Sequence, residues 1–523
     1  MDDLIPILSL MRSKGLRLWT EHGQVRYEAL RGVLTPQEIA TCQRLTPEAM
    51  ACLQPISPDS SRSTPLAPRL PTDRIPLTFS QQWVWNVLDL ERRPSTRSIA
   101  VALRLSGPLQ VQWLSRSLTQ LTRRHESLRT RVVLTEAVPW QVIGDPLESA
   151  LDTIDLSGLT PERREKQAQT LAQHLVHEPY RVSVGPLFAA RLLRLSAQEH
   201  VLVIAADHLI SDYASLGILL RDLWTLYAQR PGQTSPALPV IAVQFADYAV
   251  WQYCTRRSWM EQHGAYWSRR LSGFRPLRLF EKGVVPALSS VRMTRLPIQI
   301  GERQTTLLRQ FARRARTTMT LVVLAAYVAS LSRVCNESDL LVAFIAMERS
   351  HPEIRHTVGY FATALLLRIV LQEEDDFLAL LSRVTEEYGA SCAHADSGRM
   401  LTQNPQPQFA SNPRFNWIPA GLDVRSVYGR TDVGAVDPND PTEIRQAAFD
   451  IPPRDDLDGR NGGPELLLSD AGDTISGALW YRADLIASHT ATHLERNFTL
   501  FLDRMVTAPD ARVRTAPVAA IPG

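Results

Sequence analysis

Short apolar runs of strand length, each next to a segment of helical period, most constrain what this chain can fold into. Residues 200–206 (HVLVIAA) form a run typical of a buried strand, and a stretch with helical spacing of apolar residues follows it. Residues 321–331 (LVVLAAYVASL) and 339–346 (DLLVAFIA) predict a core helix and a second buried strand. Because no such pattern recurs at a fixed period, a repeat array is excluded. We therefore expect an α/β protein in two halves that divide near residues 250–290.

The composition permits a large buried core. Of 523 residues, 44% are hydrophobic and 21% are charged, so global disorder is excluded. The net charge of +3 does not indicate nucleic acid or a membrane surface as a partner of the whole chain. Five scattered cysteines, none in CxxC spacing, argue against a disulfide scaffold or a zinc site and fit a reducing compartment.

The N-terminal sequence MDDLIPILSL begins with two acids, whereas a secretory signal begins with a basic region. The longest apolar stretch, residues 321–331, is too short for a bilayer, which requires about 20 residues. These features predict a soluble, cytoplasmic protein with no membrane attachment.

A Pro- and Ser-rich segment, residues 55–75, predicts an extended linker that separates a head of residues 1–54. In the head, the apolar spacing of residues 3–14 predicts a helix that ends at Gly15. Pro at the first helical position after Thr35 and after Thr46 predicts two further helices. The expected order is helix, hairpin, helix, helix.

The hairpin is predicted from residues 16–20 and 24–29, which alternate apolar and polar side chains. So small a unit leaves a strand edge unpaired, and such an edge is either protected or used to capture another strand. The basic residues near it would favour an acidic peptide; they are Lys14, Arg17, Arg26 and Arg31. The alternative is a solvated hairpin whose charges serve solubility.

No GxSxG elbow, phosphate-binding loop, dinucleotide fingerprint or HExxH pair is present. One segment remains, ADHLISDYAS at residues 206–215, where a buried strand ends and a helix begins. His208 titrates near neutral pH and could accept a proton from an attacking alcohol or amine. Asp212 could orient the imidazole or form a buried salt bridge that holds the turn. The pattern alone does not separate a catalytic histidine from one satisfied by local hydrogen bonds.

Six segments, in order, resemble motifs of the condensation domains of nonribosomal peptide synthetases. They are LTFSQQWVW (77–85), RRHESLRT (123–130), DHLISDYAS (207–215), VQFADYAVWQ (243–252), VGYFATALLLR (358–368) and ISGALWYRADLI (475–486). The resemblance covers about residues 75–510. It implies two chloramphenicol-acetyltransferase-like lobes in a V arrangement with a tunnel between them. The expected lobes are residues 76–255 and 256–523.

The resemblance also implies the chemistry. An acyl chain arrives on the phosphopantetheine arm of a carrier protein and passes directly to a hydroxyl or amine, without a covalent acyl-enzyme, metal or cofactor of the enzyme's own. His208 is implied as the general base or orienting group. Asp212 is implied to be structural, paired with a basic residue for which Arg278 and Lys282 are candidates.

The sequence departs from the family pattern at several positions. Asp207 replaces the first histidine of the active-site motif; its carboxylate could raise the basicity of the neighbouring imidazole or point into the core. Tyr213 replaces the motif glycine and could narrow the space near the acceptor, whereas the trailing Ser215 is kept. Ala362 replaces an asparagine, and only His394-Ala395-Asp396 remains of a longer motif. These changes suggest an unusual substrate, and they leave open an inactive domain that serves as a carrier-docking platform.

The head resembles the β-hairpin docking domains of the tubulysin type. This implies that the hairpin, with Arg17, Trp19, Arg26 and Tyr27, binds a short linear motif at the C-terminal tail of an upstream carrier protein.

No adenylation, carrier or thioesterase signature follows residue 510, so a freestanding enzyme is expected. Its architecture resembles the chain-releasing, ester-forming condensation enzymes of the kind found in the enacyloxin polyketide pathway. A finished chain would then pass to a small diffusible acceptor, and a monomer is expected. An epimerising relative is a third possibility.

Overall fold

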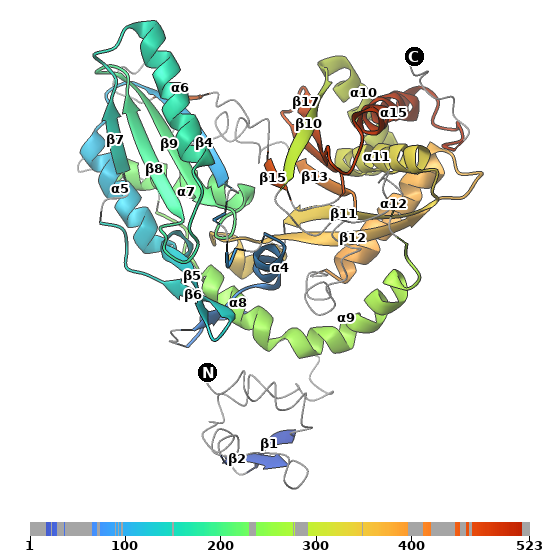
Figure 1. Ribbon diagram of the computed structural model, residues 1–523, viewed down its shortest axis with the longest axis horizontal. Helices are drawn as coiled ribbons and strands as arrows, with labels where there is room; N and C mark the ends of the chain where they lie inside the picture. The colour runs from blue at the N-terminus through green and yellow to red at the C-terminus, as the bar shows by residue number, and fades with distance from the viewer. Residues whose placement is uncertain are drawn as a thin grey trace.

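A computed structural model gives the fold as two α/β lobes side by side (Figure 1). It describes residues 17–21, 24–28, 36, 65–70, 74–88, 90–92, 94–95, 98–148, 151–229, 237–275, 277, 291–347, 349–395, 412–419, 445–449, 457–459 and 463–514. The predicted α/β class is confirmed.

The first lobe, the N-lobe, is built on a five-stranded sheet in the order β14-β4-β9-β8-β7. Its strands from this part of the chain are β4 (Ser98–Ser106), β7 (Leu151–Asp155), β8 (Phe188–Arg194) and β9 (Glu199–Asp207). The central strand β9 is buried on both faces. Leu202 and Ile204 join one apolar cluster, whereas Val201 and Val203 join the other. This explains the continuous apolar run in the sequence, and the predicted buried strand is confirmed.

Helices cover both faces of this sheet (Figure 1). Helices α5 (Val111–Arg124) and α7 (Tyr213–Ala228) pack on one face, and α6 (Pro161–His177) packs on the other. A three-stranded sheet, β3-β6-β5, lies at the base of the lobe. Its strands are β3 (Ile75–Pro76), β5 (Thr130–Thr135) and β6 (Val138–Ile143), next to η1 (Glu126–Arg129) and α4 (Phe79–Leu88).

The second lobe, the C-lobe, contains a seven-stranded sheet in the order β12-β11-β13-β16-β17-β10-β15. The strands are β10 (Val291–Ile300), β11 (Asp339–Met347), β12 (Ala362–Val370), β13 (Arg414–Ile418), β15 (Leu457–Gly459), β16 (Glu465–Asp470) and β17 (Ile475–Arg482). The second predicted strand is therefore confirmed as β11.

Four helices pack on one face of the C-lobe sheet: α10 (Glu302–Arg314), α11 (Met319–Cys335), α12 (Phe377–Ala393) and α15 (Ser488–Thr507). Helix α11 is the core helix that the apolar stretch predicted, since every residue from Leu321 to Ser332 is buried. On the opposite face, Trp267 and Phe274 pack against Leu341 and Leu366.

Three segments join the lobes. Helices α8 (Phe245–Cys254) and α9 (Arg256–Leu271) run along the base from one lobe to the other (Figure 1). A bridging loop, residues 349–361, leaves the C-lobe after β11 and places Ile354 and Val358 in the N-lobe core. Strand β14 (Arg445–Ala448) pairs antiparallel with β4. Parts of the predicted 256–523 lobe thus pack on the N-lobe; the domain boundaries remain a prediction.

The predicted hairpin in the head is confirmed. Strands β1 (Arg17–Glu21) and β2 (Gln24–Glu28) pair antiparallel. The predicted helix of residues 3–14 lies outside the described residues, as do the two later helices of the head apart from Pro36.

The end of the predicted linker packs on the N-lobe. Leu66 is buried, and the Arg69 guanidinium lies 2.6 Å from Asp247 and 3.0 Å from Glu126.

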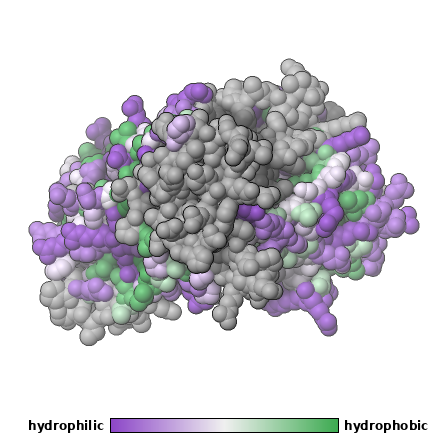
Figure 2. Space-filling model, turned by 90° about the horizontal axis from the view of Figure 1, so that it is seen from below, coloured by the Kyte–Doolittle hydropathy of each residue, from purple (hydrophilic) through white to green (hydrophobic). Residues whose placement is uncertain are grey.

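Within the described ranges, no single helix is long and apolar enough to cross a membrane. Helices α10 and α11, bent by 102° at the break between them, pass that test of length and composition only when taken together. In the view of Figure 2, hydrophilic residues predominate on the described surface at both ends of the molecule, and hydrophobic residues form small patches among them.

Candidate active site

His208 stands on the turn between β9 and α7. Its Nδ1 atom lies 2.8 Å from the carbonyl oxygen of Ser211. Because a carbonyl oxygen only accepts hydrogen bonds, Nδ1 carries the proton in the neutral ring and Nε2 carries the lone pair. The ring also contacts Tyr360 edge to face, with centroids 4.9 Å apart. The imidazole is therefore fixed in both tautomer and orientation.

Asp207, the last residue of β9, is almost completely buried. Its Oδ1 accepts a hydrogen bond of 2.8 Å from the backbone N–H of Leu209, which closes the turn that carries His208. Burial is the main cause that raises the pKa of the Tyr180 phenol, and the charge of Asp207 adds to it. Of the two roles left open by the sequence, these contacts favour a carboxylate that supports the turn from the core side.

Asp212 caps helix α7. It is fully buried, and its Oδ1 accepts a 2.7 Å hydrogen bond from the backbone N–H of Ser215. Its Oδ2 accepts from the backbone N–H of Phe361 at 3.0 Å. The carboxylate is thereby satisfied by helix α7 and by the bridging loop.

The basic partner of Asp212 is Arg349, whose Nη2 lies 3.2 Å from Oδ1. This pairing is observed among the described residues, whereas the expected candidates Arg278 and Lys282 lie outside them. Arg349 lies 137 residues beyond Asp212 at the start of the bridging loop. A pairing over that distance leaves no local pattern in the sequence.

Ser215 connects α7 to the bridging loop. Its hydroxyl donates to the carbonyl oxygen of Gly359 at 2.8 Å and accepts from the Gly359 N–H at 3.0 Å and from Arg349 at 2.8 Å. A Cβ at residue 359 would lie 2.2 Å from the ring of Phe245, so the close approach requires glycine. The hydroxyl thus has the one donor and two acceptor contacts that it can form.

A cavity of about 50 Å³ lies between the lobes, with His208 in its wall. It is lined by Ser80, Trp83, His208, Ile345, Tyr360, Ala362, Thr363, Ala364, Arg414, Asn416 and Glu465. Tyr213 does not line it; this ring packs against the N-lobe core instead. The imidazole predicted from the strand-end motif therefore borders a cavity to which both lobes contribute.

Helix α4 supports this arrangement from the opening motif of the sequence. The fully buried Gln81 donates from Nε2 to the carbonyl oxygen of Leu209 at 2.8 Å. Its Oε1 accepts from the backbone N–H of Thr78. Sequence reasoning did not single out Gln81, although the motif that contains it was recognised.

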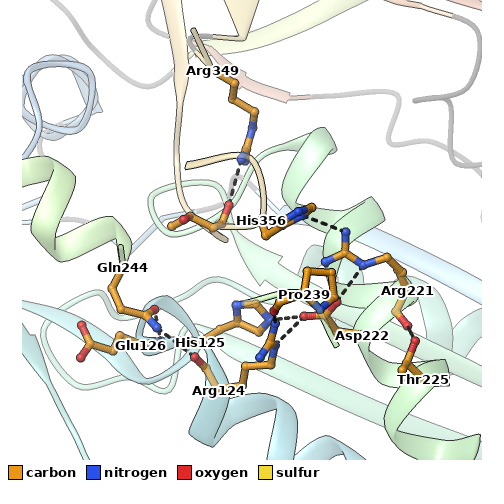
Figure 3. A network of polar contacts seen from close by, with 11 residues as sticks. Arg124, His125, Glu126, Arg221, Asp222, Thr225, Pro239, Gln244, Arg349 and His356 are labelled. Atoms are coloured by element: carbon orange, nitrogen blue, oxygen red, sulfur yellow. Dashed lines mark hydrogen bonds and ion pairs between the residues drawn. The ribbon is translucent and has the colours of Figure 1, made fainter. Parts of the chain in front are cut away.

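The arginine and histidine of the Arg-His-Glu motif form an ionic network around the buried Asp222 (Figure 3). Asp222 on α7 accepts from Arg124 at 2.8 Å, from Arg221 at 2.6 Å, and lies 2.9 Å from Nε2 of His125. These hydrogen bonds lower the pKa of Asp222 to about 2 although burial raises it. Arg221 also reaches Nδ1 of His356 on the bridging loop at 3.2 Å. The motif therefore connects α5 and α7 to the bridging loop.

Two other positions at which the sequence departs from the family pattern, Ala362 and His394, lie in different parts of the structure. Ala362 lines the cavity, whereas His394 does not. Nδ1 of His394 lies 2.8 Å from Nδ1 of His263, and its ring stacks on Tyr266 with centroids 3.8 Å apart. His394 therefore joins α12 to α9.

The four residues predicted to bind a partner lie on the hairpin of β1 and β2, and they are distant in the sequence from the residues that line the cavity. Trp19 pairs in register with Arg26, Leu18 with Tyr27, and Arg17 with Glu28. The register places each of the four on one of the two paired strands.

Residues 72–406 match the family model described as the condensation domain. The chain belongs to this family. Condensation domains are acyltransferases that form amide or ester bonds, and they act on acyl groups held by carrier proteins.

Curated relatives of this condensation domain are synthetases. It is 30% identical over 446 residues to malpibaldin synthetase of Mortierella alpina, covering 84% of this chain and 8% of the relative. It is 28% identical over 472 residues to the phosphinothricin tripeptide synthetase PhsC of Streptomyces viridochromogenes, covering 87% of this chain and 41% of that protein. The chain thus spans less than half the length of both.

Solved structures confirm the condensation-domain fold. The teicoplanin X-domain in complex with OxyB has a TM-score of 0.71 at 21% identity, covering 88% of this chain and 99% of that one. A structure that describes condensation domain-mediated chain release from the enacyloxin polyketide synthase has a TM-score of 0.65 at 20% identity, covering 99% of this chain and 98% of that one. The expected architecture of two chloramphenicol-acetyltransferase-like lobes is therefore confirmed.

Proposed function

We propose that this condensation domain transfers an acyl chain from a carrier-bound phosphopantetheine thioester to a small diffusible acceptor and thereby releases the chain. The bond formed is an ester, or an amide where the acceptor is an amine. The observation that carries the proposal is the hydrogen bond from Nδ1 of His208 to Ser211, because it makes Nε2 the basic nitrogen of a ring that lines the cavity. Similarity to the enacyloxin chain-release structure supports the release step.

The proposed step balances without any cofactor or metal. The acceptor oxygen attacks the thioester carbonyl, the new C–O bond forms, and Nε2 of His208 takes the hydroxyl proton. The C–S bond then breaks, and the proton passes to the departing thiolate of the phosphopantetheine arm. General base catalysis of this kind contributes about 10²–10⁴ in rate, and positioning of both reactants contributes at least as much.

Asp207, Asp212 and Ser215 act in this proposal as positioning residues. None of the three lines the cavity. Asp207 closes the turn, and the other two connect the start of α7 to the bridging loop that carries Tyr360. Their role is to hold His208 against the C-lobe.

The head is proposed to recruit the donor. Residues 1–54 would form a docking domain in which the hairpin binds the C-terminal tail of an upstream carrier protein, with residues 55–75 as the linker. The antiparallel pairing of β1 and β2 supports this, because a two-stranded sheet presents strand edges for a third strand. Deleting residues 1–54 should weaken transfer from the carrier but leave transfer from a small thioester surrogate intact.

Intact-mass spectrometry of an acylated carrier tests the function. The carrier is incubated with the enzyme and a panel of amines and alcohols, and loss of the acyl mass is followed over time. We expect His208→Ala to lower the rate by about 10²–10⁴. His174→Ala, at an exposed position on α6, is the matched control and should behave as wild type.

The alternative function is a catalytically inactive platform that recruits carriers or other enzymes. The similarity to a teicoplanin X-domain solved in complex with OxyB favours keeping it. Under this alternative, wild type and His208→Ala would leave the acyl carrier equally intact with every acceptor. That result would overturn the catalytic proposal.

A further inference from the structure

The C-lobe wall of the cavity is polar because of the alternation along its strands. On β13 and β16, Phe415 and Leu466 pack into the C-lobe core. The alternate residues Arg414, Asn416 and Glu465 therefore face the other side of the sheet, where they line the cavity opposite His208. Three hydrogen-bonding side chains thus lie on one wall of a cavity whose other wall holds the proposed base.

The positive charge of Arg414 favours a bound molecule that carries a negative charge. It is 8% exposed, and its guanidinium lies 4.7 Å from the ring centre of Trp83, which holds it flat against α4. The planar guanidinium has five N–H donors in a fork that matches a carboxylate, so it can bind one while keeping other contacts. The cation and the ring both line the cavity.

Glu465 limits where an anion can lie. It is the register partner of Arg414 on the neighbouring strand, and its carboxylate disfavours a second negative charge beside it. It favours a hydroxyl or an ammonium group there. The wall therefore accommodates a molecule with a carboxylate at Arg414 and a hydrogen-bond donor near Glu465.

We propose that this wall selects an acceptor that carries a free carboxylate, bound by Arg414, together with the hydroxyl or amine that attacks the thioester at His208. The proposal rests on the proposed function, because it names the acceptor of the same site. A cavity of about 50 Å³ has room for about three or four water-sized groups, enough for the polar end of a small acid. A carrier-bound acceptor has its carboxyl group tied up as a thioester, so a free carboxylate also distinguishes a diffusible acceptor from a carrier-bound one.

The test compares each acid with its own neutral derivative. Wild-type enzyme and a small acyl thioester are supplied with 3-hydroxybutyrate or its methyl ester, and with β-alanine or its amide. We expect kcat/KM to favour the acids by about tenfold or more, since charge-assisted hydrogen bonds are about twice as strong as neutral ones. The hydroxy and amino arms show which nucleophile the site takes.

Arg414→Gln should remove this preference, because it should lower kcat/KM for the acids more than for the neutral derivatives. Arg313→Gln, at an exposed position on α10, is the matched control and should retain the preference. Equal use of acid and neutral derivative by wild type would overturn the inference, and so would an equal loss for both in a folded Arg414→Gln variant. The wild-type comparison alone decides the matter if that variant does not fold.

A binding measurement distinguishes failure of this inference from failure of the proposed function. Calorimetric titration of His208→Ala with 3-hydroxybutyrate and with its methyl ester requires no turnover. Tighter binding of the acid, lost on adding Arg414→Gln, would support anion recognition even if no acyl transfer occurred, and would leave only the catalytic proposal overturned. Transfer without any preference for the acid would overturn the inference alone. No difference in binding between the acid and its ester would also overturn it.

Discussion

Two sets of polar groups near the cavity differ in how they are satisfied. On the N-lobe side, Asp212 and Ser215 have their hydrogen bonds filled by the cap of α7 and by the bridging loop. On the C-lobe side, the buried hydroxyl of Thr363 has no partner within the described part of the chain. A filled network fixes a geometry, whereas a polar group without a partner adds no such constraint. The contrast places the rigid support of the turn that carries His208 on the N-lobe side, and we propose that the acceptor is recognised on the C-lobe side.

The largest expected effect on stability lies in the N-lobe network. Asp222→Asn would leave Arg124 and Arg221 without their buried counter-charge, and breaking such a pair costs about 3–5 kcal/mol. Urea unfolding measures the change. Asp152→Asn, which breaks the exposed pair with Arg191, should cost under about 1 kcal/mol. Equal losses in the two variants would contradict the view that the buried charge of Asp222 stabilises the N-lobe.

The bridging loop should be the next most sensitive region. A Cβ at residue 359 would lie 2.2 Å from the Phe245 ring, and overpacking of this kind costs about 1–3 kcal/mol. Gly359→Ala should also lower kcat/KM, because the loop carries Tyr360 against the imidazole. Gly389→Ala, on an exposed turn of α12 with open space around it, should be neutral or gain up to about 1 kcal/mol. A fully active Gly359→Ala enzyme would show that the bridging loop does not support the site.

A smaller effect should appear as pH dependence. Burial is the main cause that lowers the pKa of His125 below its ordinary 6.5, although Asp222 opposes this. The unfolded chain takes up a proton below pH 6.5 that the folded protein takes up only at lower pH, so this contribution to stability is present above pH 6.5 and lost as the pH falls. His125→Gln should flatten the dependence of the urea midpoint on pH between about 7.5 and 5.5, whereas the exposed control His174→Gln should not.

The smallest effect is expected at Thr363 in the C-lobe. Thr363→Val removes a hydroxyl that has no partner among the described residues, so the free energy of unfolding should change by less than about 0.5 kcal/mol or rise. Ser215→Ala, in the N-lobe, removes a hydroxyl with three partners and should cost about 1–3 kcal/mol. If Thr363→Val proved the more costly of the two, the contrast between the two sets of polar groups would be wrong.

The fold was predictable where a pattern was local. The run at 200–206 and the stretch at 321–331 are buried on all sides, so their apolar character alone identified β9 and α11. His208 was found in the same way, because the end of a buried strand is a short-range signal. Its position in the cavity wall agrees with the motif, and its catalytic role stays a prediction.

The rest depended on contacts between distant segments. Arg349 reaches Asp212 across 137 residues, and no periodicity in either segment records the pairing. Arg414, Asn416 and Glu465 share a wall only because β13 and β16 pair in register. The alternation of side chains within β13 is visible in the sequence. The sequence does not show which face of the strand lies toward the other lobe.

Strand β14 has a consequence for how the protein is made. Its partner β4 ends at Ser106, yet β14 leaves the ribosome about 340 residues later. At synthesis rates of about 5–20 residues per second, the edge of the first sheet waits roughly 17–70 s for its neighbour. During that time the β4 edge of an apolar sheet remains unpaired on the nascent chain. The half that is translated first therefore gains its last strand only after most of the second half has been synthesised, and a chaperone or the growing polypeptide would shield it until then.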